Sequence, residues 1–325
     1  MKTEFKPFNE TTLDDAKSVV GAAFSPVVYQ LLEKILANPL RRELGNGSAG
    51  DIAYQNGKPV AFQAAIVRRL YIGKNPIIGV VGSTLGALPE TSPVMLMQLM
   101  KRTIASRDGS VLFFANTANA TSMKMNRLLG VKGMGPRTCE QIRFASIVSF
   151  PVLRNLCPRS SAVKLDKIDK EQFDIFWTKY LNDNKGVVAS RSSAELEWMF
   201  GDNVAKGTDV ILATYEGSEI SGYIVVRKSR KGRGWLVVDM LALDNDRATL
   251  RLLLVSAVRY LRREARSLIL ESIGFPLYVE DLTRSILPLY RKTLNNTFLF
   301  KAIDPGFTVP ESSWFFGPYD GDRSM

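Results

Sequence analysis

The hydrophobic positions of the first 150 residues follow two different periods. Apolar residues three or four apart predict amphipathic helices, whereas alternating or short apolar runs predict strands. The expected elements are strand 3–8, helices from Thr11 and from Ser25, strands 51–54, 59–70 and 77–88, a helix from Pro93, strand 111–115, a helix near 121–129 and strand 140–150. Asn56-Gly57 lies between two of these strands and is a strong hairpin signal.

The second part of the chain repeats this order after residues 151–161, which contain two prolines and little periodicity. The expected elements are strand 162–165, helices 171–181 and 194–200, strands 210–215, 220–227 and 235–243, helix 247–266, strand 268–273, helix 282–294 and strand 298–302. The shared order indicates a duplicated fold rather than a short-period repeat. We therefore expect a mixed α+β protein of two domains, residues 1–150 and 162–325, joined by the linker 151–161.

Composition narrows the chemistry that the chain can perform. The sequence has 325 residues and no histidine, which excludes a Ser-His-Asp triad and a histidine-ligated zinc site. General acid–base catalysis would then fall to Asp, Glu, Tyr, Lys or a terminal amine. The formal net charge of +11 favours anionic partners, although a basic surface also serves solubility alone.

The sequence predicts neither export nor a membrane span. The start, MKTEFKPFNETTLDDAK, lacks the apolar core and the cleavage site of a signal peptide. No apolar run approaches the roughly 18 residues that a membrane helix needs. Two cysteines, Cys139 and Cys157, are too few for a disulfide framework. We expect a cytoplasmic protein, and we predict no bound metal and no nucleic-acid partner.

The stretch 76–132 contains a junction suited to binding an anion. Ser92 is a good helix N-cap, and Pro93 is a good first helical residue. Unpaired amides and the positive end of the helix dipole make such a helix start attractive to anions. The amides expected there are those of Val94, Met95 and Leu96. Glycines along the preceding strand indicate either a bulge or a tight packing contact: Gly79, Gly82 and Gly86.

The order of elements resembles two tandem copies of the GNAT N-acetyltransferase superfamily. The second copy carries the supporting motifs: RSSAELEWMF (191–200), GYIVVR (222–227), DMLAL (239–243), Trp314 and DGD (320–322). The chain looks most like the tandem GNAT-like proteins of bacterial polysaccharide gene clusters. The resemblance implies, in each copy, a mostly antiparallel splayed sheet flanked by helices. It also implies acetyl-CoA or another acyl-CoA as co-substrate.

The same resemblance implies a CoA site in the first copy. Its residues would be Leu85, Gly86, Leu88, Ser92, Val94, Met95 and Asn119. The family's glycines between strand and helix are missing here, and Asn126 stands where the family often has a tyrosine that protonates the leaving thiolate. In the second copy, Asp244 or Asp246 caps the corresponding helix and would repel a pyrophosphate.

The catalytic candidates are Glu90, as a general base acting through water, and Tyr290, as an acid of the second copy. The implied function is N-acyl transfer to a small-molecule amine, with an anionic acceptor, an amino sugar or a sugar nucleotide as candidates. An alternative is a non-catalytic GNAT-like binding or scaffold protein with degenerate CoA loops. A basic nucleic-acid-binding protein is a third reading, which rests on charge alone.

Overall fold

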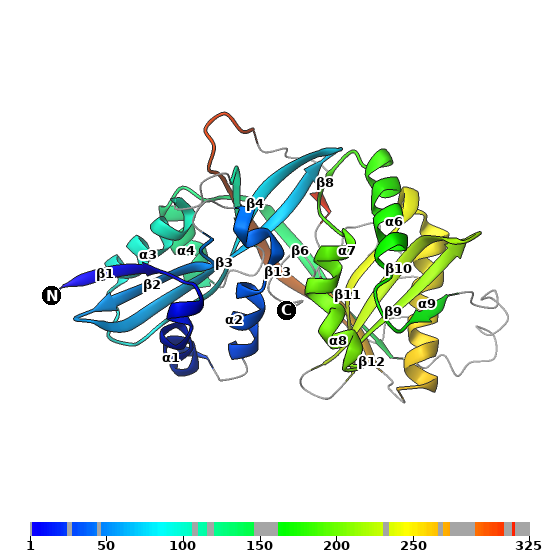
Figure 1. Ribbon diagram of the computed structural model, residues 1–325, viewed down its shortest axis with the longest axis horizontal. Helices are drawn as coiled ribbons and strands as arrows, with labels where there is room; N and C mark the ends of the chain where they lie inside the picture. Colours follow the sequence, from blue (N-terminus) through cyan, green and yellow to red (C-terminus); the bar gives the residue numbers. More distant parts are fainter. Residues whose placement is uncertain are drawn as a thin grey trace.

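The structure is a computed structural model. It describes residues 2–24, 28–43, 47–105, 110–115, 120–145, 162–229, 234–265, 269–273, 290–308 and 314–315. Two lobes lie side by side, with the N-terminal half in one and most of the C-terminal half in the other (Figure 1).

The N-terminal half follows the expected order. Its elements are β1 (Thr3–Pro7), α1 (Leu13–Ala23), α2 (Tyr29–Leu36), β2 (Gly50–Gln55), β3 (Lys58–Ile72), β4 (Asn75–Ala87), α3 (Pro93–Ala105), β5 (Leu112–Ala115), α4 (Ala120–Leu128) and β6 (Lys132–Ala145). The Asn-Gly hairpin is confirmed, because Asn56 and Gly57 both have positive φ, 51° and 80°, as a type I′ turn requires.

The C-terminal half repeats the order with additions. Its elements are β7 (Val163–Leu165), α6 (Lys170–Asp183), β8 (Val187–Ala189), α7 (Ser193–Leu196), the π-helical turn η4 (Glu197–Gly201), α8 (Asp202–Ala205), β9 (Asp209–Glu216), β10 (Glu219–Lys228), β11 (Trp235–Ala242), the 3₁₀ turn η5 (Leu243–Asn245), α9 (Arg247–Arg263), β12 (Ile269–Ile273), β13 (Tyr290–Ala302) and β14 (Trp314–Phe315).

Five strands of each half pair in the same way. In the order β1-β2-β3-β4-β5 and in the order β7-β9-β10-β11-β12, three antiparallel pairings precede one parallel pairing. The mostly antiparallel sheet flanked by helices is therefore confirmed in both halves. Helices cover opposite faces of each half-sheet: Phe62 lies in the cluster with α1, and Ala61 in the cluster with α3.

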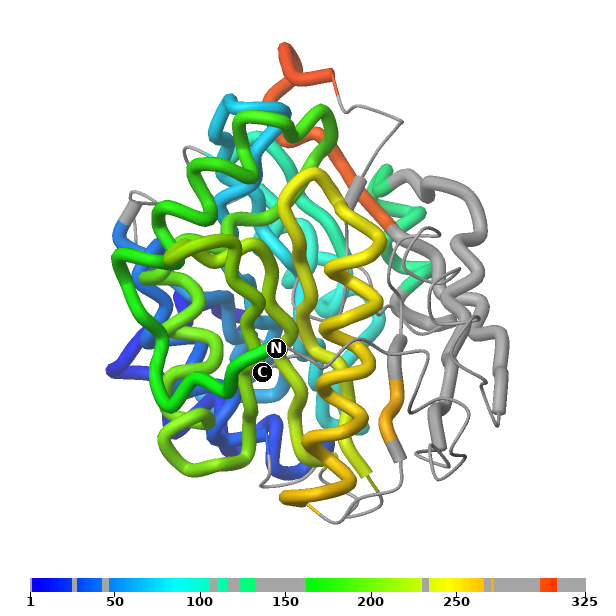
Figure 2. The backbone as a smooth tube through the Cα atoms, turned by 90° about the vertical axis from the view of Figure 1, so that its right-hand side faces the viewer, coloured from blue at the N-terminus to red at the C-terminus, as the bar shows by residue number. Residues whose placement is uncertain are grey.

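In the C-terminal half, adjacent residues of β10 face different helices. Gly222 lies against Leu253 of α9, whereas the ring of Tyr223 makes an edge-on contact with Phe173 of α6. Seen from the C-terminal half, α6 in green and α9 in yellow lie in front of the blue and cyan N-terminal half (Figure 2).

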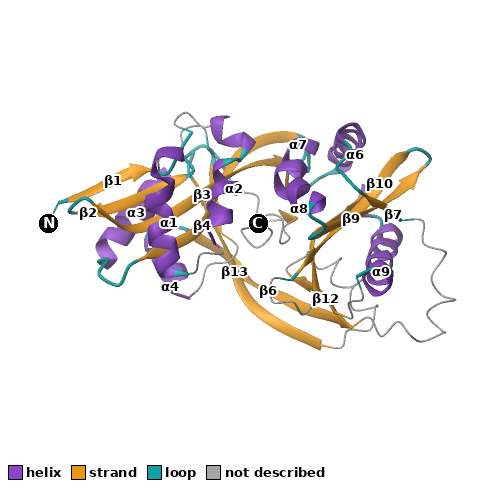
Figure 3. Cartoon of the chain, turned by 60° about the horizontal axis from the view of Figure 1, so that its bottom comes forward, coloured by secondary structure: helices purple, strands orange, loops and turns teal. Residues whose placement is uncertain are grey.

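The two half-sheets exchange strands where they meet. The order continues β5-β13-β6-β12, so β13 lies between β5 and β6 of the other half, and β6 pairs with β12 (Figure 3). The linker 151–161 lies outside the described residues, so the domain boundary there stays a prediction. The helix expected at 282–294 is wrong for residues 290–294, which form the start of β13.

Candidate functional site

The sheet of the N-terminal half opens between β4 and β5. Their parallel pairing joins Gly79, Val80 and Val81 to residues 112–114 and then stops. β4 continues to Ala87, and among the described residues it has no strand partner on this edge beyond Val81. An unpaired edge presents backbone hydrogen-bonding groups to whatever enters the opening.

A β-bulge lies at the point where the strands part. Ser83 of β4 pairs with Ala64 of β3, and Gly86 pairs with Phe62, so β4 contains one extra residue in this interval. Thr84 has φ 45°, which is unusual for a β-branched side chain. The bulge that the glycine spacing indicated is therefore present, although its strained residue is a threonine. Strained residues of this kind cluster at functional sites.

Two backbone N–H groups of β4 point into the opening. Backbone groups alternate between the two edges of a strand, and the Leu88 N–H donates to Val60 O of β3 at 2.9 Å. Gly86, two residues earlier, faces β3 as well, whereas Leu85 and Ala87 face the opening. Of the strand residues that sequence analysis assigned to the cofactor, Leu85 offers a free edge amide, and Gly86 and Leu88 do not.

The N-terminus of α3 follows the opening directly. Ser92 Oγ accepts a hydrogen bond from the Met95 N–H at 3.2 Å, so the predicted N-cap is confirmed. The Leu96 N–H donates to Ser92 O at 3.1 Å. The expectation of three unpaired amides is therefore wrong for Met95 and Leu96. The described part of the chain provides no hydrogen-bond acceptor for the Val94 N–H.

Side chains of the same helix turn face in opposite directions. Val94 is 66% exposed, whereas Met95 is buried in the cluster that includes Val60 and Leu99. Met95 is thus a core residue, as is Met100. An anion that approaches this helix start meets Val94 and not the methionine.

Three residues around the opening, two aromatic and one polar, were not predicted from the sequence. A Cβ added at Gly82 would lie 2.5 Å from the ring of Phe113 and 3.5 Å from Nε2 of Gln63. A Cβ added at Gly86 would lie 3.1 Å from the ring of Phe24, which is 54% exposed. The glycines signalled close neighbours, but nothing in the sequence indicated which residues these would be.

The remaining candidates are spread more widely. Glu90 is exposed in the turn between β4 and α3, and its role as a base stays a prediction. Asn119 lies outside the described residues. Asn126 is buried within α4. Tyr290, expected on a helix, is the first residue of β13, where it pairs with Arg143 of β6, and thus belongs to the strand exchange between the halves.

The equivalent place in the C-terminal half is filled by charged side chains of its own. Asp239 lies at the bulge of β11 and is fully buried with Arg191, whose guanidinium is 3.2 Å from its carboxylate. The Tyr223 hydroxyl donates to the other carboxylate oxygen at 2.5 Å. The Asp246 carboxylate caps α9, and hydrogen bonds from Thr249 lower the pKa of Asp246. The Asp246 carboxylate opposes an anionic ligand at the start of α9, and the Arg191 guanidinium is already paired with Asp239.

Several solved structures share this architecture. A GCN5-related N-acetyltransferase from Kribbella flavida is 14% identical, with a TM-score of 0.66 over 93% of this chain and 71% of that one. A tandem GNAT protein from the clavulanic acid biosynthesis pathway is 12% identical, with a TM-score of 0.55 over 94% of this chain and 100% of that one.

The chain has a tandem GNAT fold. Saccharomyces cerevisiae N-myristoyltransferase, solved with bound myristoyl-CoA, is also similar, at 12% identity and a TM-score of 0.57 over 92% of this chain and 79% of that one. No family model and no curated protein matches the sequence. At these identities the likeness concerns the fold alone.

The tandem GNAT fold also encloses a cleft between its halves. About 660 Å³ in volume, it lies between α2 and the segment η4–α8. Trp198 Nε1–H donates to Lys34 O at 2.8 Å, and Lys34 Nζ donates to Met199 O. Burial, assisted by the Arg227 guanidinium, lowers the pKa of Lys34 to about 8. This cleft joins the halves and is separate from the opening of β4.

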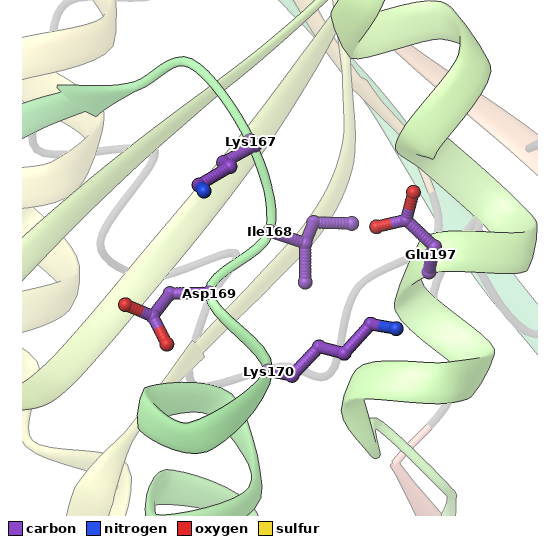
Figure 4. A pocket seen from close by; sticks show the side chains of 5 residues that line it. All are labelled: Lys167, Ile168, Asp169, Lys170 and Glu197. Carbon is purple, nitrogen blue, oxygen red and sulfur yellow. The ribbon is translucent and has the colours of Figure 1, made fainter.

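A smaller hollow of about 350 Å³ lies at the start of α6. Figure 4 shows Lys170 extending toward the turn that carries Glu197, with Lys167 and Asp169 pointing elsewhere. Asp169 caps α6 by accepting from the Gln172 N–H at 3.2 Å. The hollow therefore contains a helix cap and surface charges, and we assign it no ligand.

Two features are absent from the described residues. No helix among them is both long enough and apolar enough to span a membrane. No group of three or more Cys, Asp or Glu side chains among them is arranged to hold a metal ion.

Proposed function

We propose that the chain is an N-acyltransferase that moves an acyl group from acyl-CoA to an amine at the opening of the N-terminal half. The observation that carries this proposal is the unpaired β4 edge, bulged at Thr84 and followed directly by the neutral N-cap of α3. An acyl-CoA needs a donor for its thioester carbonyl and a site for its phosphates, and this edge and helix supply both.

Each backbone group has a role in the proposal. The Leu85 and Ala87 N–H groups are the donors for the thioester oxygen, on which negative charge develops as the amine attacks. The Val94 N–H and the dipole of α3 attract a phosphate. The amine nitrogen forms a bond to the carbonyl carbon, the carbon–sulfur bond breaks, the nitrogen loses a proton, and the thiolate gains one. Acyl-CoA supplies the activated thioester.

Proton transfer in this proposal involves one side chain. Glu90, exposed beside the opening, is the base that takes the amine proton through water. We assign no side chain to thiolate protonation, so that proton comes from water. The net charge of +11 favours an acceptor that is itself anionic, such as an amino sugar phosphate or a sugar nucleotide.

Charged residues of the C-terminal half support the proposal that acyl-CoA binds to the N-terminal half. Ser92 leaves the dipole of α3 unneutralised, whereas Asp246 places a carboxylate on the N-terminus of α9. The buried Arg191–Asp239 pair fills the second bulge. The C-terminal half then serves as a partner of the active half.

The test is isothermal titration calorimetry with acetyl-CoA, longer acyl-CoAs and free CoA. Wild-type protein should bind at least one of them. Val94→Glu should weaken binding about tenfold, because it adds a carboxylate beside the amide that receives the phosphate. Val163→Glu is the matched control, since Val163 is 51% exposed on β7 of the other half. A wild-type protein that binds none of these compounds would overturn the proposal.

One observation favours a second candidate function, CoA binding without catalysis. Asn126, at the position that the resemblance gives to the thiolate acid, is buried in α4. An amide cannot donate a proton at neutral pH as a phenol or a carboxylic acid does. Release of free thiol from acetyl-CoA, followed over a panel of amino sugars and other amines, separates the two functions.

A further inference from the structure

Gln63 lies next to the point where β4 and β5 separate. It lies on β3 in the interval where the register with β4 shifts, between Phe62 and Ala64. Its amide nitrogen is 3.5 Å from the Cβ position of Gly82, where β4 leaves β5. The residue is 4% exposed. The side chain therefore lies where the two strands part, inside the sheet and not at its rim.

The carbonyl oxygen of this side chain has no hydrogen-bond donor in the described part of the chain. Among the described residues, no N–H or O–H group is within hydrogen-bonding distance of Gln63 Oε1, although the atom is buried. Its neighbours on this face include the ring of Phe113 and, opposite it on β2, the buried Asp51, whose carboxylate accepts hydrogen bonds from Arg102 and Thr103 of α3. A buried acceptor without a donor is destabilising, and such groups in native proteins call for an explanation.

We infer that Gln63 is a binding residue for the acyl donor, whose pantetheine arm supplies the missing donor through one of its amide N–H groups. This inference rests on the proposed function, because the arm has to enter between β4 and β5. The arm contains two secondary amides and is otherwise largely apolar. Gly82 has no side chain, so the chain of the ligand can pass close to the β4 backbone. The bare backbone, the ring of Phe113 and the single acceptor suit such a ligand.

The test compares two probes by calorimetry. CoA carries the arm, and adenosine 3′,5′-bisphosphate lacks it. Gln63→Leu removes the acceptor at similar volume, and Gln63→Met is the second variant should leucine not fit. Each should bind CoA about tenfold more weakly than wild type and bind the bisphosphate equally well. Thermal stability should be unchanged or higher, because a buried acceptor without a donor has been removed.

A matched control comes from the other half. Gln172 of α6 also has a buried carbonyl oxygen without a donor among the described residues. Gln172→Leu should leave both affinities unchanged.

The outcomes separate the inference from the function on which it rests. Equal CoA affinity of wild type and both Gln63 variants would overturn the inference and leave the proposed function standing. An equal loss of affinity for CoA and the bisphosphate would also overturn it, because the effect would then not involve the arm. A wild-type protein that binds neither probe would overturn both.

Discussion

Lys34 is the described lysine whose ionisation responds most to folding. Burial against the other half lowers its pKa from 10.5 to about 8, and the cationic Arg227 and Arg68 act in the same direction. Asp209 and Asp202 oppose them. Folding therefore shifts the equilibrium of this side chain toward the neutral amine. Between about pH 8 and 10.5 the Lys34 side chain binds more protons in the unfolded chain than in the folded chain. The contribution of Lys34 to the free energy of unfolding therefore rises with pH through that window.

A comparison of wild type with Lys34→Met makes this measurable. From pH 7 to pH 10 the free energy of unfolding of wild type should rise relative to the variant by about 2 kcal/mol. Urea denaturation at both pH values measures the difference. Lys206→Met removes an exposed lysine of the same cleft and serves as the control. A flat difference for Lys34→Met would contradict the assigned burial effect.

The Arg191–Asp239 pair gives a second prediction for single residues. Both side chains are fully buried, and Asp239 also accepts from Tyr223. Asp239→Ala should lower the free energy of unfolding by about 3–5 kcal/mol, because it removes the buried carboxylate that pairs with the Arg191 guanidinium. The double variant Arg191→Met/Asp239→Ala should regain part of this loss, since the buried guanidinium is removed as well. Denaturant titration of the three proteins measures both effects, and a double variant that is no more stable than the single one would refute the explanation.

Individual elements show what the sequence could predict. Hairpins, amphipathic helices and the Ser92 cap follow from local rules, and these were predicted from hydrophobic spacing and turn residues. The bulge in β4 was indicated by glycine spacing. Which residues close around it was not predictable, because Phe24 follows α1, Phe113 lies on β5 and Gln63 lies on β3, and they meet only in the folded protein.

The misread elements depend on partners distant in the sequence. Residues 282–294 have leucines at helical spacing, yet residues 290–302 form a strand paired on both sides, with β5 and β6. β8 has three residues, and it pairs with β3 and β14, which come from opposite ends of the chain. Pairing across a sheet overrides local propensity in such segments, and a single sequence does not reveal the partners.

The whole molecule depends on the exchange of strands between halves that look separate in the sequence. β13 belongs to the C-terminal half by chain order, yet its described pairings are with β5 and β6 of the other half. β6 in turn pairs with β12. The Trp198–Lys34 and Lys34–Met199 hydrogen bonds join the lobes again at the cleft. Neither half can complete its sheet alone.

Separate expression of residues 1–150 and 162–325 tests this dependence. Each fragment should aggregate when produced alone, because the N-terminal fragment exposes the edges of β5 and β6, and the C-terminal fragment leaves β13 unpaired. The two fragments produced together should form a soluble complex, and size-exclusion chromatography measures this. The full chain should correspondingly unfold in one cooperative transition. A 1–150 fragment that is monomeric and unfolds cooperatively would mean that the first half completes its sheet without β13, and the acyl-donor opening would then belong to an independent domain.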